Sequence, residues 1–280
     1  KPYIAHASIG PSCALARIDR KRIEVWSHSQ GVYQLRYDLA TVLEMPLEDI
    51  IVHHAEGSGC YGHNGADDVA CDAALLARAT DGRPVKLQWM REDEFAWEPY
   101  GSAMVIKMQA QIDDARHIVN WQHEIWSHPH STRPMSRPDG AFLLGGWHLA
   151  NPTPATVPMN SPQPSGAADR NSIPLYDFPR QNILLHYLTD MPVRTSALRT
   201  LGAYANVFAA ESFMDELAHA AGKDPYRYRR ELLARTKLPF KNDMIKALDM
   251  AAEMSGWGTP LPKGTARAIA LEERGAETGG

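Results

Sequence analysis

The stretch "HHAEGSGCYGHNGADD" (His53–Asp68) contains four glycines, three histidines, one cysteine and three acidic residues. It overlaps the end of "EDIIVHHA", an apolar run typical of a β-strand, and leads into "ADDVACDAALLARAT", in which apolar residues recur at helical spacing. Asp67 and Asp68 fall in the first turn of that predicted helix, where the helix dipole favours negative charge. The sequence therefore predicts a strand, a glycine-rich loop and a helix over residues 48–80.

A zinc site is one interpretation of this loop. Four of its side chains are of types that bind zinc: His53, His54, Cys60 and His63. Structural zinc sites usually show two pairs of ligands at short spacing, and no second pair lies nearby. Neighbouring histidines on a strand would also point to opposite faces. These features argue against protein ligands to a metal.

The two other interpretations are a loop that binds an anion or a cofactor, and a solvent-facing turn without a ligand. Glycines let the backbone approach a ligand closely, and a helix N-terminus presents N–H groups to an anion. The loop is not a P-loop, because Gly-Lys-Ser/Thr is absent, and its nearest Gly-x-Gly-x-x-Gly frame lies well ahead of the helix. The stretch alone leaves both interpretations open.

Composition excludes several classes of protein. The chain has 280 residues, of which 44% are hydrophobic and 22% charged, and a formal net charge of −4. These values are typical of a globular protein and provide no basic field for nucleic acid or an anionic membrane. No apolar run approaches the roughly 18–20 residues that span a bilayer. Three cysteines form neither a disulfide framework nor the four ligands of an iron–sulfur cluster, so any cluster is expected on another chain.

The rest of the chain predicts an α+β fold with mixed or antiparallel sheets packed against helices. Residues 129–182 are rich in Pro, Gly, Ser and Asn and predict a long irregular segment that wraps a surface or lines a site. The region 203–255 is predicted to be helical. Glu211 and Asp215, four residues apart, are expected to pair with nearby Arg or Lys rather than to act as a catalytic acid pair. The other predicted elements are strands at 22–29, after 84 and at 182–188, a helix at 33–45 and a hairpin around Asp113–Arg116.

Three segments in order resemble one enzyme family. They are "SHSQGVY" with Gln30, "GSGCYGHNGADD", and "RTSALRTLGAYANVFAAESFMDELAHAAGKDP". This order resembles the large, molybdopterin-binding subunit of the xanthine dehydrogenase/aldehyde oxidase family of molybdenum hydroxylases. "AHASIGPSCALA", "CYGHNGADD" and "ESFMDELA" are similar to the branch of isoquinoline 1-oxidoreductase, nicotinate dehydrogenase and certain bacterial aldehyde dehydrogenases. The resemblance extends over nearly the whole chain and implies the molybdenum-cofactor-binding type of α+β domain.

The resemblance also implies site residues. Gln30 matches a glutamine whose amide lies by the apical oxygen of molybdenum, and Arg199 matches an arginine near the pterin and metal. The backbone around Tyr61 matches a loop usually written Gly-Gly-Phe-Gly, with Tyr in place of Phe. Leu201 stands where an aromatic residue often flanks substrate, and Trp147 is a candidate to line the same pocket as Tyr61 and Leu201. The complete predicted set for the cofactor is Gln30, Gly59, Cys60, Tyr61, Gly62, His63, Ala197, Leu198 and Arg199.

The cofactor implied is molybdopterin cytosine dinucleotide, whose metal takes no protein ligand. The family hydroxylates N-heteroaromatic compounds or aldehydes with water as the oxygen source, and electrons leave through iron–sulfur clusters. The implied partners are the remainder of the large subunit and a small [2Fe–2S] subunit, with a cytochrome c subunit as a further candidate.

The domain prediction is a first molybdopterin-binding domain over 1–264 and the truncated start of a second over 265–280. The family's catalytic glutamate is expected beyond residue 280, since Gly275-Ala276-Glu277 mimics its context only superficially. The chain alone is then expected to be inactive. A non-catalytic, cofactor-free module that assembles with partners is the alternative from another functional class.

Overall fold

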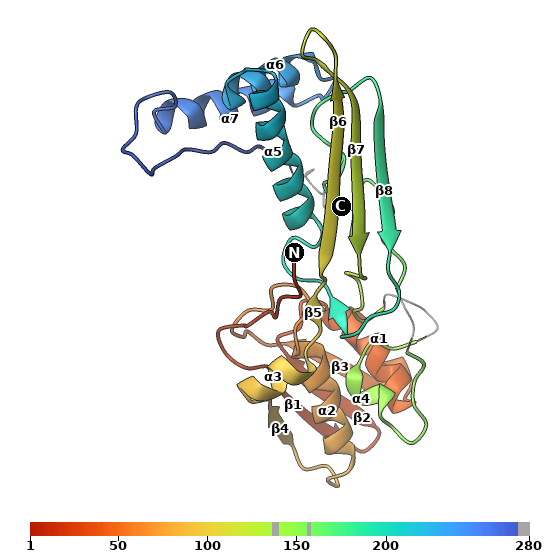
Figure 1. The fold of residues 1–280 in the computed structure, drawn as a ribbon. Helices are drawn as coiled ribbons and strands as arrows, with labels where there is room; N and C mark the ends of the chain where they lie inside the picture. The colour runs from red at the N-terminus through yellow and green to blue at the C-terminus, as the bar shows by residue number, and fades with distance from the viewer. Residues whose placement is uncertain (136–139, 156–157, 274–280) are drawn as a thin grey trace. The chain divides into compact units, whose positions relative to one another are not determined.

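A computed structural model describes residues 1–135, 140–155 and 158–273 of the chain (Figure 1). The Cα positions divide the chain into two compact units. Unit 1 contains Lys1–Met104, Ser127–Ala168 and Tyr187–Leu201, and unit 2 contains Val105–Trp126, Asp169–His186 and Gly202–Gly280. The boundary between a first and a second molybdopterin-binding domain at residue 264 stays a prediction. Gly275-Ala276-Glu277 lies outside the described residues.

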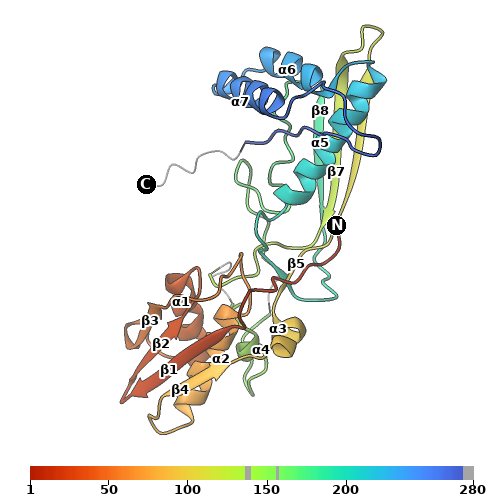
Figure 2. The ribbon, with the colours of Figure 1, turned by 90° about the vertical axis from the view of Figure 1, so that its left-hand side faces the viewer.

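Unit 1 is built on a four-stranded mixed sheet with the order β3-β2-β1-β4. Strands β1 (Cys13–Asp19) and β2 (Arg22–Ser27) form an antiparallel hairpin, β3 (Ile50–His54) runs parallel to β2, and β4 (Val85–Gln88) is antiparallel to β1. Helices α1 (Val32–Leu43) and α2 (Ala66–Arg78) lie behind the strands in Figure 2. The predicted strand, loop and helix over residues 48–80 are therefore confirmed as β3, loop and α2.

One face of this sheet forms the core of unit 1. Residues alternate along a strand between the two faces, and β1 and β2 bury one alternate set against the helices. Ala14, Ala16, Ile23 and Val25 pack in one cluster with residues of α1 and α2. Five alanines of α2 are fully buried, and their small side chains let the helix lie close to the sheet: Ala66, Ala70, Ala73, Ala74 and Ala77.

Short elements complete unit 1. A 3-10 turn, η1 (Leu47–Asp49), precedes β3, and helix α3 (Arg91–Trp97) follows β4. Strands β5 (Tyr100–Gly101) and β9 (Thr195–Ser196) pair in parallel, so the segment around residue 195 is fixed to unit 1. Among the described residues between 129 and 180, the only helix or strand is α4 (Leu144–Trp147), which confirms the predicted irregular segment.

This irregular segment is held to the helices of unit 1 by carboxylates. Asp38 of α1 accepts hydrogen bonds from the backbone N–H groups of Met135 (3.0 Å) and Phe142 (2.7 Å). Asp68 of α2 accepts one from Leu144 N–H (2.8 Å). Hydrogen bonds to carboxylates satisfy N–H groups that no regular element pairs.

The described residues of unit 2 form a three-stranded sheet and three helices. The strands are β6 (Met104–Ile112), β7 (Ile118–Ser127) and β8 (Gln181–Tyr187) in the order β6-β7-β8, and the predicted hairpin joins β6 to β7. The helices are α5 (Ala203–Ala220), α6 (Pro225–Arg235) and α7 (Lys241–Met254). Trp121 of β7 packs against Phe213 of α5, with ring centroids 5.6 Å apart. No helix among the described residues has the length and apolar character needed to cross a membrane.

A buried ion network ties α5 to α6. The Arg229 guanidinium is fully buried and contacts the Glu211 carboxylate at 2.8 Å and the Asp215 carboxylate at 2.6 Å. The Tyr176 hydroxyl donates to Glu211 as well (3.2 Å). The predicted pairing of both acids with an arginine is therefore confirmed, because a charge buried here requires a partner.

The buried carboxyl group of Asp38, on α1, is expected to make the stability of the fold depend on pH. Burial raises the pKa of Asp38 to about 6, against the opposing effect of the Phe142 and Met135 hydrogen bonds. The folded chain therefore binds this proton more tightly than the unfolded chain, and stability from this group falls as pH rises from about 4 to about 6. We expect Asp38→Asn to remove about 2–3 kcal/mol of pH-dependent change in the free energy of unfolding.

Urea unfolding at pH 4 and pH 7 measures this change. Asp19→Asn, at an exposed position, is the control and should keep the wild-type difference between the two pH values. An Asp38→Asn variant with that same difference would contradict the prediction.

Candidate cofactor-binding site

The glycine-rich loop and the segment before α5 meet at one residue pair. Gly62 and Leu198 form an isolated antiparallel bridge. It is flanked by two backbone hydrogen bonds, from His63 N–H to the Ala197 carbonyl (2.7 Å) and from Arg199 N–H to the Tyr61 carbonyl (2.6 Å). Both segments belong to unit 1. The structure therefore joins two of the predicted cofactor-binding segments.

Glycine is required at position 62 because the two backbones approach so closely. A Cβ atom added to Gly62 would lie 2.1 Å from the Ala197 carbonyl oxygen, and the residue has a φ of +121°. Gly59, with φ of +95°, packs against the Tyr61 ring, which its Cβ would approach to 2.7 Å. Tyr61 itself adopts a left-handed φ of +56°. The glycines thus allow the loop to fold on itself and on the Leu198 segment.

The bridge leaves two backbone donors unpaired. Gly62 and Leu198 face each other as the pair that exchanges no hydrogen bonds, so their N–H groups point away from the partner segment. Neither N–H donates a hydrogen bond to any residue that the structure describes. The two groups point to opposite sides of the bridge, so only a large ligand could contact both.

Gln30 lies beside this loop through its backbone. Its N–H lies near the sulfur of Cys60, and the single S–H of Cys60 faces Asn64 Oδ1 at 3.0 Å and the Gly62 carbonyl at 3.2 Å. Burial raises the pKa of the Cys60 thiol to about 11, so the thiol stays protonated at neutral pH and keeps its role as a donor. The Gln30 side chain is exposed between β2 and α1.

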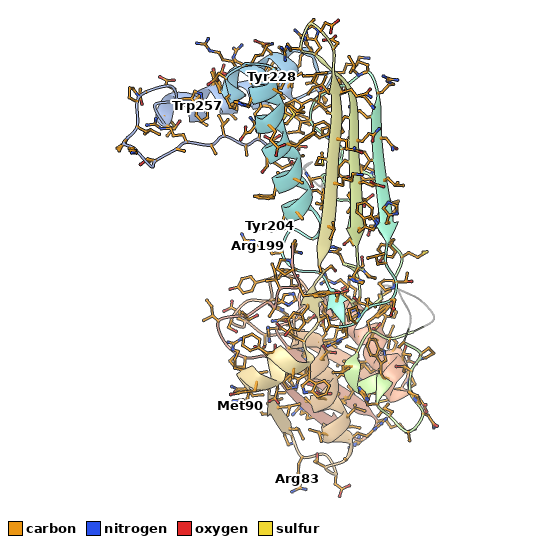
Figure 3. The ribbon with its side chains drawn as sticks, in the orientation of Figure 1. Arg83, Met90, Arg199, Tyr204, Tyr228 and Trp257 are labelled. Carbon is orange, nitrogen blue, oxygen red and sulfur yellow. The ribbon has the colours of Figure 1, made fainter. Side chains whose placement is uncertain are left out.

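Arg199 lies at the tip of a tight turn. Leu201 N–H donates to the Leu198 carbonyl (2.7 Å), and Thr200 and Leu201 adopt left-handed φ values of +75° and +56°. The Arg199 side chain is exposed (Figure 3) and has no ion-pair partner in the described part of the chain. Leu201 is half-buried. The turn thus presents a guanidinium close in sequence to the unpaired Leu198 amide.

His63 lies behind the loop rather than on its surface. Its side chain is fully buried, with Nδ1 2.9 Å from the Ser196 hydroxyl and Nε2 3.1 Å from the Asp67 carboxylate. Its backbone N–H is bonded to Ala197. Burial alone would raise the pKa of Asp67, but hydrogen bonding and charge from His63 lower it. Any contribution of His63 to a bound group is therefore indirect.

Trp147 is held by the irregular segment and by Arg194. Its indole N–H donates to the Ala141 carbonyl (2.8 Å), and the Arg194 guanidinium lies 5.8 Å from its ring. Arg194 in turn forms a bidentate pair with Asp68 at 2.7 and 3.0 Å. No ring contact or hydrogen bond among the described residues joins Trp147 to Tyr61. The shared pocket of these two residues stays a prediction.

The candidate zinc ligands of the loop do not form a cluster among the described residues. His53 stacks on Trp26, with ring centroids 4.9 Å apart, and lies 3.5 Å from Glu24, while His63 is buried elsewhere. Within residues 1–135, 140–155 and 158–273, no group of three or more His, Cys, Asp or Glu could hold a metal ion.

Several residues near the loop have no local signal in the sequence. The Ser8 hydroxyl accepts a hydrogen bond from the Asn64 amide (2.8 Å), and His6 Nε2 donates to the Ala197 carbonyl (2.8 Å). Arg133, from the irregular segment, is close enough for its charge to favour the ionised form of Asp67. These contacts join residues far apart in the chain, so spacing could not have indicated them.

Comparison with known proteins identifies the family. The molybdopterin cofactor-binding domain family matches residues 2–138. A nicotinate dehydrogenase subunit from Pseudomonas putida is 40% identical over 256 residues, which cover 91% of this chain and 20% of that protein. The chain belongs to the molybdenum hydroxylase family. The relative confirms the resemblance to the branch that includes nicotinate dehydrogenase.

Two further similar proteins are consistent with this family and its fold. PaoC, the molybdenum-binding subunit of aldehyde oxidoreductase from Escherichia coli O157:H7, is 26% identical over 91% of this chain and 32% of its own length. The crystal structure of quinoline 2-oxidoreductase from Pseudomonas putida 86 is similar with a TM-score of 0.66 and 16% identity, over 91% of this chain and 31% of that one. That likeness supports the α+β fold. The chain thus spans about a fifth to a third of the length of these relatives.

The unpaired groups fit the cofactor that this family binds. Phosphate oxygens accept hydrogen bonds, and four donors around the loop have no partner among the described residues: Gly62 N–H, Leu198 N–H, the Gln30 amide and the Arg199 guanidinium. Asp67 and Asp68, which would repel an anion, are buried and paired with His63 and Arg194. The donor set therefore suits a ligand that is rich in acceptor oxygens.

The close approach of the Gly62 and Ala197 backbones predicts that adding a methyl group at residue 62 will destabilise the fold. We expect Gly62→Ala to lower the free energy of unfolding by about 2–4 kcal/mol, because both the contact with Ala197 and the positive φ are unfavourable. Gly222→Ala is the matched control, since Gly222 has φ of +67° with no atom within 4 Å of an added Cβ. It should cost about 1 kcal/mol. Chemical denaturation of both variants measures the difference, and equal losses would contradict the role of the clash.

Proposed function

We propose that this chain is part of the large subunit of a molybdenum hydroxylase that oxidises an N-heteroaromatic compound or an aldehyde with water as the oxygen source. Electrons would pass to iron–sulfur clusters on a partner chain. The proposal is supported chiefly by the Gly62–Leu198 bridge, which joins the two segments that match the cofactor-binding motifs of the family. The relatives' names support the substrate classes, since they are nicotinate dehydrogenase and aldehyde oxidoreductase.

The proposed cofactor is molybdopterin cytosine dinucleotide. Its pterin and phosphate oxygens would accept hydrogen bonds from Leu198 N–H and Gly62 N–H and a charge-assisted pair from Arg199. The Gln30 amide would donate to an oxo oxygen on the metal. When bound, the cofactor supplies the two-electron oxidation chemistry that no side chain can provide.

The chain's own residues would bind and orient the cofactor. The backbone from Gly59 to Gly62 is fixed by the Cys60 thiol and the bridge, so its donors are preorganised before the cofactor arrives. We keep Tyr61, Leu201 and Trp147 as proposed pocket residues. His63 contributes through Ser196 and Asp67 rather than by direct contact.

The assembly is part of the proposal. We infer a first molybdopterin-binding domain over 1–264 and the start of a second over 265–280. The partners would be the remainder of the large subunit and a small [2Fe–2S] subunit, with a cytochrome c subunit as a further candidate. Because the family's catalytic glutamate is expected beyond residue 280, we expect no turnover by this chain alone.

Two substitutions in the complete enzyme test the site. Gln30→Ala and Arg199→Ala should each lower molybdenum occupancy or turnover at least about tenfold, which corresponds to about 1.4 kcal/mol, because each removes a donor to the cofactor. Gln88→Ala and Arg83→Ala are matched controls, since both residues are exposed in unit 1, and the Arg83 side chain donates to the Thr80 carbonyl of its own turn.

Elemental analysis and a steady-state assay measure the outcome. Wild-type molybdenum content and rates in both Gln30→Ala and Arg199→Ala would defeat the site assignment. A complete assembly that contains no molybdenum would instead favour the non-catalytic assembly module.

A further inference from the structure

Two buried histidines contact the segment just before Arg199. His6 Nε2 lies 2.8 Å from the Ala197 carbonyl oxygen, and because a carbonyl only accepts, this nitrogen carries a hydrogen. The backbone N–H of His6 donates to Glu98 Oε1 at 2.9 Å, which fixes the histidine to α3 and the residues that follow it. The side chains of His6 and Glu98 are buried, with 0% and 1% of their surface exposed.

His63 holds the adjacent residue from the other segment. The Ser196 hydroxyl donates to the Thr132 carbonyl (3.0 Å), so it accepts from His63 Nδ1–H at 2.9 Å. The Asp67 carboxylate lies 3.1 Å from the other ring nitrogen. The side chains of His63 and Asp67 are 0% and 4% exposed.

These contacts determine where the following amide points. The Ala197 carbonyl accepts two hydrogen bonds, from His6 Nε2 and from His63 N–H. The peptide unit is planar and trans, so fixing this carbonyl also fixes the opposite direction of Leu198 N–H. Leu198 begins the turn that carries Arg199. The two histidines therefore act on both donors that this segment offers.

We propose that His6 and His63 are positioning residues for the molybdenum cofactor. They hold the Ala197 carbonyl and the Ser196 hydroxyl so that Leu198 N–H and Arg199 stay aligned for binding. The inference rests on the proposed function, since it concerns the same cofactor contacts. It goes further by assigning buried residues that never touch the cofactor.

A pair of substitutions at His6 in the complete enzyme tests the inference. His6→Leu removes the donor to Ala197 and should lower molybdenum per polypeptide at least about fivefold and speed amide hydrogen exchange in residues 197–201 at least about tenfold. His6→Gln places an amide N–H near the position of Nε2 and should restore most of both values. A purely space-filling role would not distinguish Gln from Leu in this way.

His186→Leu is the matched control. His186 is also paired with a carboxylate, Glu124 at 3.0 Å, and stacked on Trp126, but the pair is half-exposed on β7 and β8 in unit 2. It should leave molybdenum content and exchange in residues 197–201 unchanged. Ser196→Ala is a milder second variant, which removes only the hydroxyl that His63 contacts, and should lower molybdenum content about threefold.

The outcomes separate this inference from the proposed function. Loss of molybdenum in Arg199→Ala, with wild-type content and exchange in His6→Leu and Ser196→Ala, overturns the positioning role alone. Equal loss in His6→Gln and His6→Leu also overturns it, because the donor would then not matter. Wild-type molybdenum content in Arg199→Ala overturns the proposed function itself.

Discussion

Two backbone hydrogen bonds across the Gly62–Leu198 pair connect the glycine-rich loop to the turn at Arg199. The pairing is possible only because residue 62 lacks a Cβ atom, which would collide with the Ala197 carbonyl. It satisfies the N–H groups of His63 and Arg199 and leaves those of Gly62 and Leu198 without a partner among the described residues. The same geometry therefore closes the loop and leaves two N–H donors available, which we propose bind the cofactor.

The two acids that directly follow the loop lie beneath its surface, while hydrogen-bond donors remain exposed. Asp67 and Asp68 open α2 directly after the loop, yet both are buried, the first against His63 and the second against Arg194. The exposed charged or polar groups include the Gln30 amide, the Arg199 guanidinium and the Glu56 carboxylate earlier in the loop. A protein that holds a metal through a pterin needs this arrangement rather than a cage of metal ligands.

Local patterns in the sequence were sufficient for many of the elements, although not for β1, α3 or α4, and not for the long-range contacts. Apolar spacing predicted β3 and α2 on either side of the loop, and α5 with its acids Glu211 and Asp215, because these features depend on neighbours within a few residues. The bridge to Leu198 and the burial of His63 depend on residues brought together from distant segments, and no spacing encodes them. Trp147 shows the same limit, since an aromatic residue in an irregular segment has no periodicity that could have indicated its contact with Arg194.

Amide hydrogen exchange at single-residue resolution, compared between cofactor-loaded and cofactor-free protein, tests the central claim most directly. If Gly62 and Leu198 donate to the cofactor, their exchange should slow at least about tenfold on loading. His63 and Arg199, whose N–H groups are already bonded within the chain, should change much less. Equal exchange of Gly62 and Leu198 in the two forms would contradict the account.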